Sequence, residues 1–110
     1  MSITFKDHSG EVLEALEQAK QRGLEAIGLA AEGHAKKSAP VDTGRLRNSI
    51  AHAVKGDAAY IGTNVEYAPY VELGTSRQAP KPYLRPAATQ HGSEYKALMQ
   101  ASIDEELKNK

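Results

Sequence analysis

Four histidines, His8, His34, His52 and His91, are the side chains best suited to acid–base or metal chemistry. They lie far apart in the sequence, and none belongs to a ligand pattern such as His-Glu-x-x-His. The chain has no cysteine, which excludes disulfides and thiolate metal ligands. His34 and His91 fall on helical stripes, and His52 falls on one face of a strand. We therefore expect core or surface histidines, with no metal site and no cofactor.

The motifs of common enzyme classes are also missing. The sequence contains no Gly-x-Ser-x-Gly elbow, no phosphate-binding loop and no dinucleotide fingerprint. Two turns, Thr43-Gly44-Arg45 and Gly74-Thr75-Ser76-Arg77, could hold an anion with backbone N–H groups and an arginine. Because Gly-Thr turns are common, we interpret both as ordinary turns. The sequence predicts no catalytic residues and no enzymatic activity.

The centre of the chain combines stiff turns with tyrosine and arginine. All five prolines lie between Pro40 and Pro86. Such turns are costly to order unless something contacts them, and tyrosine and arginine are enriched in binding hot spots. A core position remains the alternative for each tyrosine, but Tyr70 and Tyr83 are expected at a contact. The predicted subunit or partner interface consists of Arg45, Arg47, Tyr67, Tyr70, Glu72, Thr75, Arg77, Pro80, Lys81, Tyr83 and Arg85.

Charge is distributed in alternating blocks although the total is zero. The net charge is −3 over residues 1–33, +4 over 34–55, −3 over 56–76, +3 over 77–91 and −1 over 92–110. Such blocks favour contacts between proteins. The two basic clusters, Lys36, Lys37, Arg45 and Arg47, then Arg77, Lys81 and Arg85, leave a nucleic-acid-binding or regulatory protein as the alternative. Pairing of these arginines with Glu66, Glu72 or another subunit is the simpler interpretation.

Helices are predicted at both ends of the chain. Val12, Leu16, Ala19, Gly23, Ile27, Ala30 and His34 recur at steps of three and four, so a long helix is expected from Glu11 to about Lys37, capped by Ser9. Its glycines predict a bend or the close approach of a neighbour. A last helix is expected from about Ala87 to Leu107, with Gly92 as a weak point.

Between these helices the pattern predicts a hairpin and a short helix. Residues 49–54 alternate in polarity, Gly56-Asp57 forms a turn, and residues 58–62 return as a second strand. Pro69 favours the start of a short helix that Gly74 stops. Met1–His8 is expected as a strand or an arm, and Asp42–Gly44 as a turn or cap. The length of the chain predicts a single domain, 1–110. The order of the predicted elements places it in the α+β class, as a small antiparallel sheet with three helices packed on it.

Two blocks of the sequence resemble a known family. The first is Pro40-Val41-Asp42-Thr43-Gly44-Arg45-Leu46 with Ser49-Ile50. The second is Tyr67-Ala68 with Tyr70-Val71-Glu72-Leu73-Gly74-Thr75, followed by Pro80 and Pro82-Tyr83-Leu84-Arg85-Pro86-Ala87. In this order and spacing they resemble the tail-component family of long-tailed double-stranded DNA bacteriophages and prophages. Members of that family are small neck or tail-completion proteins that help to join the DNA-filled head to the tail.

The resemblance implies a virion structural protein in the neck, assembled in the host cytoplasm. Its copies would form a closed ring, hexameric to match tail symmetry, around the DNA path. The implied partners are a head-side connector or stopper protein on one face and a tail-tube or tail-terminator protein on the other. Genomic DNA would pass through the lumen without specific recognition, and no membrane is involved. We further expect the segment Gly74–Arg85 to dock on a neighbour and to become ordered only in the assembled state.

Overall fold

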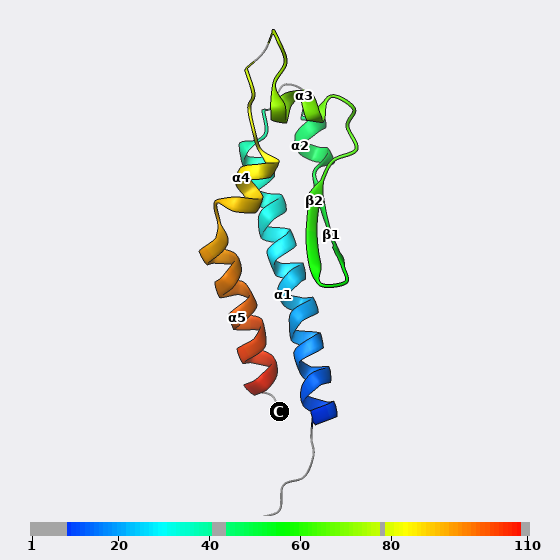
Figure 1. Cartoon of the computed structure of the whole chain (residues 1–110), viewed down its shortest axis with the longest axis vertical. Coiled ribbons are helices and arrows are strands. Elements are labelled where there is room, and N and C mark those ends of the chain that lie inside the picture. Colours follow the sequence, from blue (N-terminus) through cyan, green and yellow to red (C-terminus); the bar gives the residue numbers. More distant parts are fainter. Residues whose placement is uncertain (1–8, 41–43, 78, 109–110) are drawn as a thin grey trace, which may run out of the picture.

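The computed structural model describes residues 9–40, 44–77 and 79–108. Figure 1 shows an elongated molecule built along one long helix. Within the described ranges the elements are α1 (Ser9–Ser38), α2 (Arg45–Ser49), β1 (Ala51–Lys55), β2 (Ala58–Gly62), α3 (Ala68–Leu73), α4 (Leu84–Thr89) and α5 (Gly92–Lys108). The expected arm at Met1–His8 and the turn residues Asp42 and Thr43 lie outside these ranges. None of the described helices is long and apolar enough to cross a membrane.

Helix α1 is the scaffold of the molecule. Its 30 residues span about 45 Å at 1.5 Å per residue. The side chains that it buries are small, namely Ala15, Ala19, Ala31 and Ala35. The expected buried stripe is confirmed at Ala19 and Gly23. Val12 and Leu16, which were expected on the same stripe, are exposed. Small side chains let neighbouring elements approach the helix axis closely on two sides.

Two of its glycines serve this close approach. A Cβ atom on Gly23 would lie 2.5 Å from Sδ of Met99 in α5. A Cβ atom on Gly28 would lie 2.8 Å from Cδ2 of His52 in β1. Nothing lies within 4 Å of a Cβ atom built on Gly33. Close approach therefore explains the first two glycines and does not explain the third.

The two strands form an antiparallel hairpin against α1. Lys55 pairs with Ala58 across the two-residue turn Gly56-Asp57. Gly56 has φ of 59°, and no non-glycine residue described has a positive φ, so the turn is of the II′ kind that suits hairpins. The side chains of His52 and Val54 are partly covered, in alternation with exposed neighbours. The first strand starts at Ala51 rather than Ser49 because Ser49 ends α2.

The three short helices and the C-terminal end of α1 enclose the hydrophobic core at one end of the molecule. Ile50 and Tyr83 are its largest fully buried side chains. The cluster consists of Ala35, Ala39, Leu46, Ile50, Val65, Ala68, Tyr83 and Ala87. We call this end, residues 36–40, 44–50, 63–77 and 79–89, the head. Its core fixes the relative positions of the loop-rich central segments.

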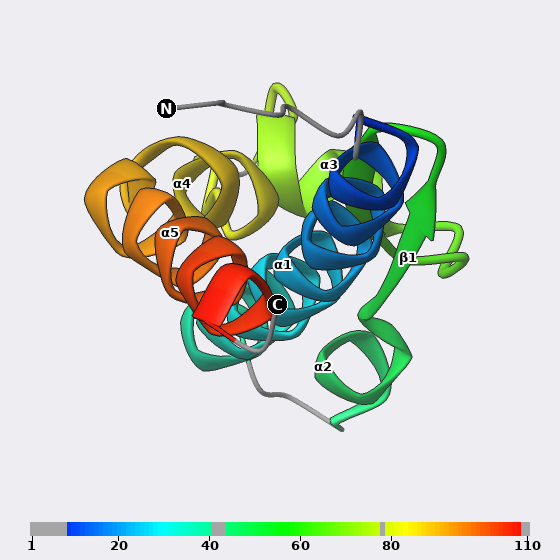
Figure 2. The same ribbon diagram turned by 90° about the horizontal axis from the view of Figure 1, so that it is seen from below.

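The C-terminal helix α5 packs antiparallel along α1. The Ser102 hydroxyl donates a hydrogen bond to the carbonyl oxygen of Ala19 at 2.7 Å, and Arg22 contacts Glu106 at 3.0 Å. In Figure 2, α1 lies between α5 and the hairpin. The predicted α+β class is confirmed, but α5 packs on α1 rather than on the sheet. The predicted last helix is divided at Gln90–His91 into α4 and α5.

Candidate partner-binding surface

A loop projects from the head between α3 and α4. We call residues 74–77 and 79–82 the projecting loop; it forms the upper tip of the molecule in Figure 1. Gly74 ends α3 with φ of 78°, and its N–H donates to the Tyr70 carbonyl at 2.9 Å. On the returning side, the Lys81 N–H donates to the Val71 carbonyl at 2.8 Å. Both ends of the loop are thus fastened to α3.

Glu72 closes the base of this loop. Its carboxylate accepts hydrogen bonds from the backbone N–H groups of Tyr83 at 3.1 Å, Leu84 at 2.8 Å and Arg85 at 3.4 Å. These N–H groups belong to the first turn of α4, where no intrahelical acceptor exists. Glu72 was expected at a partner interface, but its carboxylate is occupied inside the chain. Its part in the surface is to hold the projecting loop.

Arg45 joins α2 to the segment that precedes α3. Its guanidinium forms two hydrogen bonds to the Glu66 carboxylate, at 3.2 and 2.9 Å. The same group lies 5.5 Å from the centre of the Tyr67 ring, a cation–π distance. A backbone hydrogen bond and the Arg45 guanidinium lower the pKa of Glu66. The expected pairing of a basic cluster with Glu66 is therefore confirmed for Arg45.

Most of the predicted interface residues lie at the surface of the head. Tyr70 is 60% exposed, and Tyr67 is partly covered. Tyr83 is 0% exposed, so in this structure it takes the core position that is the alternative for each tyrosine. Burial raises the pKa of its hydroxyl, with Glu72 and Tyr67 contributing. The other exposed members are Arg45, Arg47, Thr75, Arg77, Pro80, Lys81 and Arg85.

Sequence reasoning missed Leu73, which is 78% exposed at the end of α3. It borders an open apolar groove of about 440 Å³. The groove is lined by residues 62–66, Ala68, Pro69, Glu72, Leu73 and Leu84. An exposed leucine beside an apolar groove is a feature of protein contact surfaces. The sequence did carry a signal for its position at the end of a helix, because Leu73 directly precedes Gly74, the glycine that stops α3.

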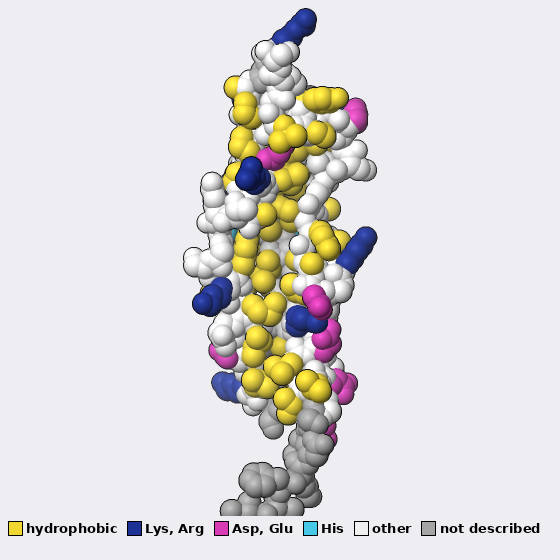
Figure 3. Space-filling model, in the orientation of Figure 1, with side chains coloured by type: hydrophobic (Ala, Val, Ile, Leu, Met, Phe, Trp, Pro, Cys, Tyr) yellow, Lys and Arg dark blue, Asp and Glu magenta, His cyan; other side chains and the backbone are white. Residues whose placement is uncertain are grey.

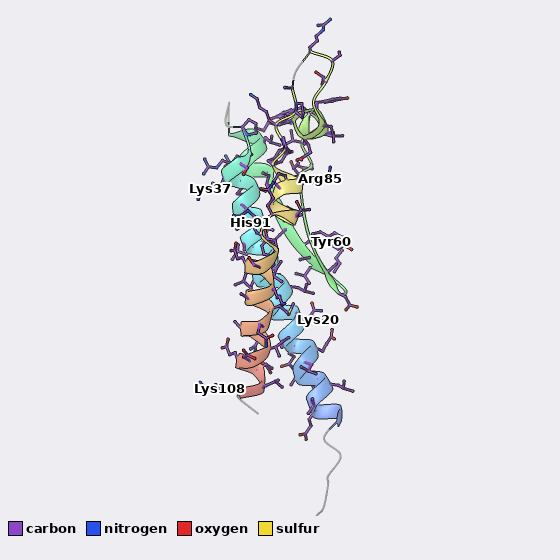
Figure 4. The ribbon with its side chains drawn as sticks, turned by 60° about the vertical axis from the view of Figure 1, so that its left-hand side comes forward. Lys20, Lys37, Tyr60, Arg85, His91 and Lys108 are labelled. Atoms are coloured by element: carbon purple, nitrogen blue, oxygen red, sulfur yellow. The ribbon has the colours of Figure 1, made fainter. Side chains whose placement is uncertain are left out.

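Positive charge collects at the head. Among the described residues it carries seven basic and two acidic side chains: Lys36, Lys37, Arg45, Arg47, Arg77, Lys81 and Arg85, with Glu66 and Glu72. Figure 4 shows Lys37 and Arg85 at this end, and Figure 3 shows a basic side chain at its tip. Both acidic groups are engaged within the chain. The head therefore carries a net positive charge.

Two histidines distant in sequence meet where α5 begins. The rings of His34 and His91 stack in parallel, with centres 3.6 Å apart and planes 4° apart. Nε2 of His34 lies 2.7 Å from the Glu94 carboxylate, and Nδ1 of His91 lies 3.8 Å from it. Such donor atoms could bind a metal ion. However, parallel rings direct their lone pairs side by side rather than at one point. The expectation of no metal site remains a prediction.

His52 fastens the hairpin to α1. Its two ring nitrogens contact Glu25 at 2.5 Å and Glu32 at 3.0 Å. The hydrogen bond to Glu25, followed by that to Glu32, raises the pKa of His52. Contact with His52 is also the main cause of the lowered pKa of Glu32. This cluster is an internal support and lies away from the head surface.

A comparison with protein families gives one finding. The family described as "Bacteriophage HK97-gp10, putative tail-component" matches residues 4–74, which is more than half of the chain. The matched range includes α1, the hairpin and α3. Neither the curated proteins nor the solved structures gave a match to the chain.

Proposed function

The chain belongs to the HK97-gp10-like family of bacteriophage tail components. From this premise we propose that it joins the DNA-filled phage head to the tail in the neck of the virion. In this role it is a structural protein and not an enzyme. The observation that carries the proposal is the head surface. Exposed Tyr70, exposed Leu73 and the projecting loop belong to this surface, and Leu73 lines an open apolar groove.

The fixed base of the projecting loop supports a binding role. The Tyr70 carbonyl holds its first end, and Val71 and Glu72 hold its returning end, so the cost of ordering the loop at a contact is reduced. The side chains of Arg77 and Lys81 are exposed and have no ion-pair partner among the described residues. A loop that is anchored but uncovered suits a contact with another virion protein. We propose that it becomes fully ordered only in the assembled particle.

The proposed assembly is a closed ring around the DNA path, hexameric to match the tail. One face meets a head-side connector or stopper protein, and the other meets the tail tube or its terminator. Repeated identical contacts between copies close into a ring when the rotation fits. DNA passes through the lumen, where basic side chains contact phosphate without reading sequence. Subunits would collect in the host cytoplasm before joining the particle.

Deletion of the gene from the phage or prophage that encodes the chain tests this function. We expect a lysate that contains DNA-filled heads and separate, finished tails, and few joined particles. Addition of the purified chain to that lysate should restore joined, infectious particles. A purified chain with Leu29→Ser is the control and should restore joined particles equally well, because Leu29 is 60% exposed on α1 outside the head of the molecule. Normal particles from the deletion strain would overturn the proposal.

The basic head also gives a second candidate, a small prophage protein that binds nucleic acid. Seven basic side chains against two acidic ones could contact several phosphates. A salt titration of duplex DNA binding separates the two functions. A nucleic-acid-binding protein loses affinity steeply as salt increases, because each phosphate contact releases a counterion. For a joining protein we expect weak binding that is the same for any DNA sequence.

A further inference from the structure

The end of the molecule opposite the head is apolar and acidic. We call it the foot, residues 10–25 of α1 and 100–108 of α5, which meet at the bottom of Figure 1. Leu13 is 65% exposed, and Val12, Leu16 and Leu107 are exposed beside it in the same region. Positions 12, 13 and 16 share one side of a helix. Figure 3 shows hydrophobic side chains clustered at this lower end.

The charge of the foot is opposite to that of the head. It carries seven acidic and three basic side chains: Glu11, Glu14, Glu17, Glu25, Asp104, Glu105 and Glu106, with Lys20, Arg22 and Lys108. Lys20 already forms ion pairs with Glu17 and Asp57 of the same chain. Arg22 forms an ion pair with Glu106. Exposed apolar side chains in a net negative region therefore stand at one end, and an apolar groove in a net positive region stands at the other.

The two ends cannot meet within one molecule. Leu13 of the foot and Lys36 of the head lie about 35 Å apart along the axis of α1, at 1.5 Å per residue. Complementary potentials favour the association of two surfaces, and like charges discourage head-to-head or foot-to-foot contacts. From these facts we propose that the foot of one copy docks on the head of the next copy. Leu13 and its neighbours then face Leu73 and the groove beside it, with Arg77 and Lys81 facing the foot's glutamates.

This proposal rests on the proposed function for its biological setting, because it supplies the contact between ring subunits. The contact is heterologous, so it can continue from copy to copy until a ring closes. Two copies that lie side by side and antiparallel would make the same foot-to-head contact twice. No free foot or head would remain, so assembly would end at a dimer. The two arrangements share the same pairs of residues and differ in the number of copies joined.

The absence of cysteine makes a cross-linking test clean. Leu13→Cys and Leu73→Cys are prepared as separate variants, mixed, and treated with a short thiol-specific cross-linker at high protein concentration and in assembled particles. We expect a cross-linked pair that contains one chain of each variant. Leu29→Cys mixed with Leu73→Cys is the control, because Leu29 is similarly exposed but lies outside the foot. The control mixture should give little product.

One chain that carries both Leu13→Cys and Leu73→Cys reports how many copies join. A ladder of products beyond the dimer supports the ring contact, and a ladder that ends at the dimer overturns the ring arrangement. Absence of the Leu13–Leu73 product both in solution and in particles overturns the foot-to-head contact itself. That failure is distinct from failure of the proposed function, because the deletion strain is scored by joined particles and not by cross-links.

A charge exchange gives a second, independent readout. Glu14→Lys in the foot and Arg77→Glu in the head each remove one favourable charge, and each should weaken self-association by about tenfold or less. The two changes together in one chain should recover part of the loss. Lys96→Glu, on the exposed middle of α5, is the matched control and should have no effect. Equal effects of all three single changes would contradict the proposal.

Discussion

The Glu72 carboxylate of α3 accepts a hydrogen bond of 2.8 Å from the backbone N–H of Leu84, the first residue of α4. It also accepts hydrogen bonds from the next residue on either side. One side chain thus caps a helix and closes the base of the projecting loop. The capped N–H groups have no acceptor within α4, so this carboxylate holds the loop together with the backbone hydrogen bonds of Gly74 and Lys81 to α3.

Replacement of Glu72 should loosen the loop without unfolding the head. Glu72→Ala removes the acceptor and should lower the free energy of unfolding by about 1–2 kcal/mol, the usual cost of a lost helix cap. Glu72→Gln keeps one acceptor oxygen and should cost less. Amide exchange at Leu84 and Lys81 measures the loosening. Unchanged protection of both amides in Glu72→Ala would show that the cap does not hold the loop.

The hydroxyl of Tyr83 is buried and lacks a hydrogen-bond partner within the described structure. A buried polar group without a partner costs free energy, so Tyr83→Phe should be neutral or stabilising by about 1 kcal/mol. Tyr83→Ala removes the ring and should cost about 3–5 kcal/mol, as large cavities do. Urea unfolding of both variants measures the difference. A marked loss in Tyr83→Phe would mean that the hydroxyl has a partner in the folded protein.

Three glycines of α1 should respond differently to alanine. Gly33 has open space around it, so Gly33→Ala should stabilise the helix by up to about 1 kcal/mol. In Gly28→Ala the new methyl group meets the His52 ring, and we expect a loss of about 1–3 kcal/mol. Gly23→Ala should fall between them, because the Met99 side chain that it meets is flexible. Thermal unfolding of the three variants gives the order, and any other order contradicts the packing described here.

The raised pKa of His52 predicts how stability depends on pH. A histidine with a higher pKa in the folded than in the unfolded protein stabilises fully below its unfolded pKa, about 6.5. That contribution is lost as pH increases through the folded-state pKa. Glu32, whose pKa is lowered, acts in the opposite sense and loses its contribution as pH falls. Stability should therefore be greatest between the two transitions.

Urea unfolding at a series of pH values from below about 6.5 upward tests this dependence. The wild-type free energy of unfolding should fall as pH increases, and the slope should be smaller in His52→Gln, which cannot be protonated. His34→Gln, on α1, is a control for the loss of a histidine outside the hairpin. A slope that is the same in the wild type and in His52→Gln would show that the contacts with Glu25 and Glu32 do not favour the protonated ring.

Local sequence signals identified most elements because each element obeys a local rule. The hydrophobic period predicted α1, the Gly56-Asp57 turn predicted the hairpin, and Gly74 predicted the end of α3. The single domain 1–110 and the interface residues remain predictions. What sequence reasoning could not supply depends on contacts between distant segments.

Three examples show this dependence on distant contacts. The burial of Tyr83 results from α1, α2 and α3 closing around it, and its own neighbours Pro82 and Leu84 do not indicate this. The capping role of Glu72 requires α4 to begin beside it, eleven to thirteen residues later. The packing of α5 on α1 rather than on the sheet follows from Ala19 and Gly23, where small residues admit a helix.

The position of the chain in the finished virion decides whether it is a neck protein. Purified particles should contain the chain in a fixed ratio to the tail-terminator protein, and images of the head–tail junction should contain a closed ring of its copies. Within that ring, the foot of each copy should lie against the head of the next. Particles that lack the chain, or that hold it only at the far tip of the tail, would contradict the function proposed here.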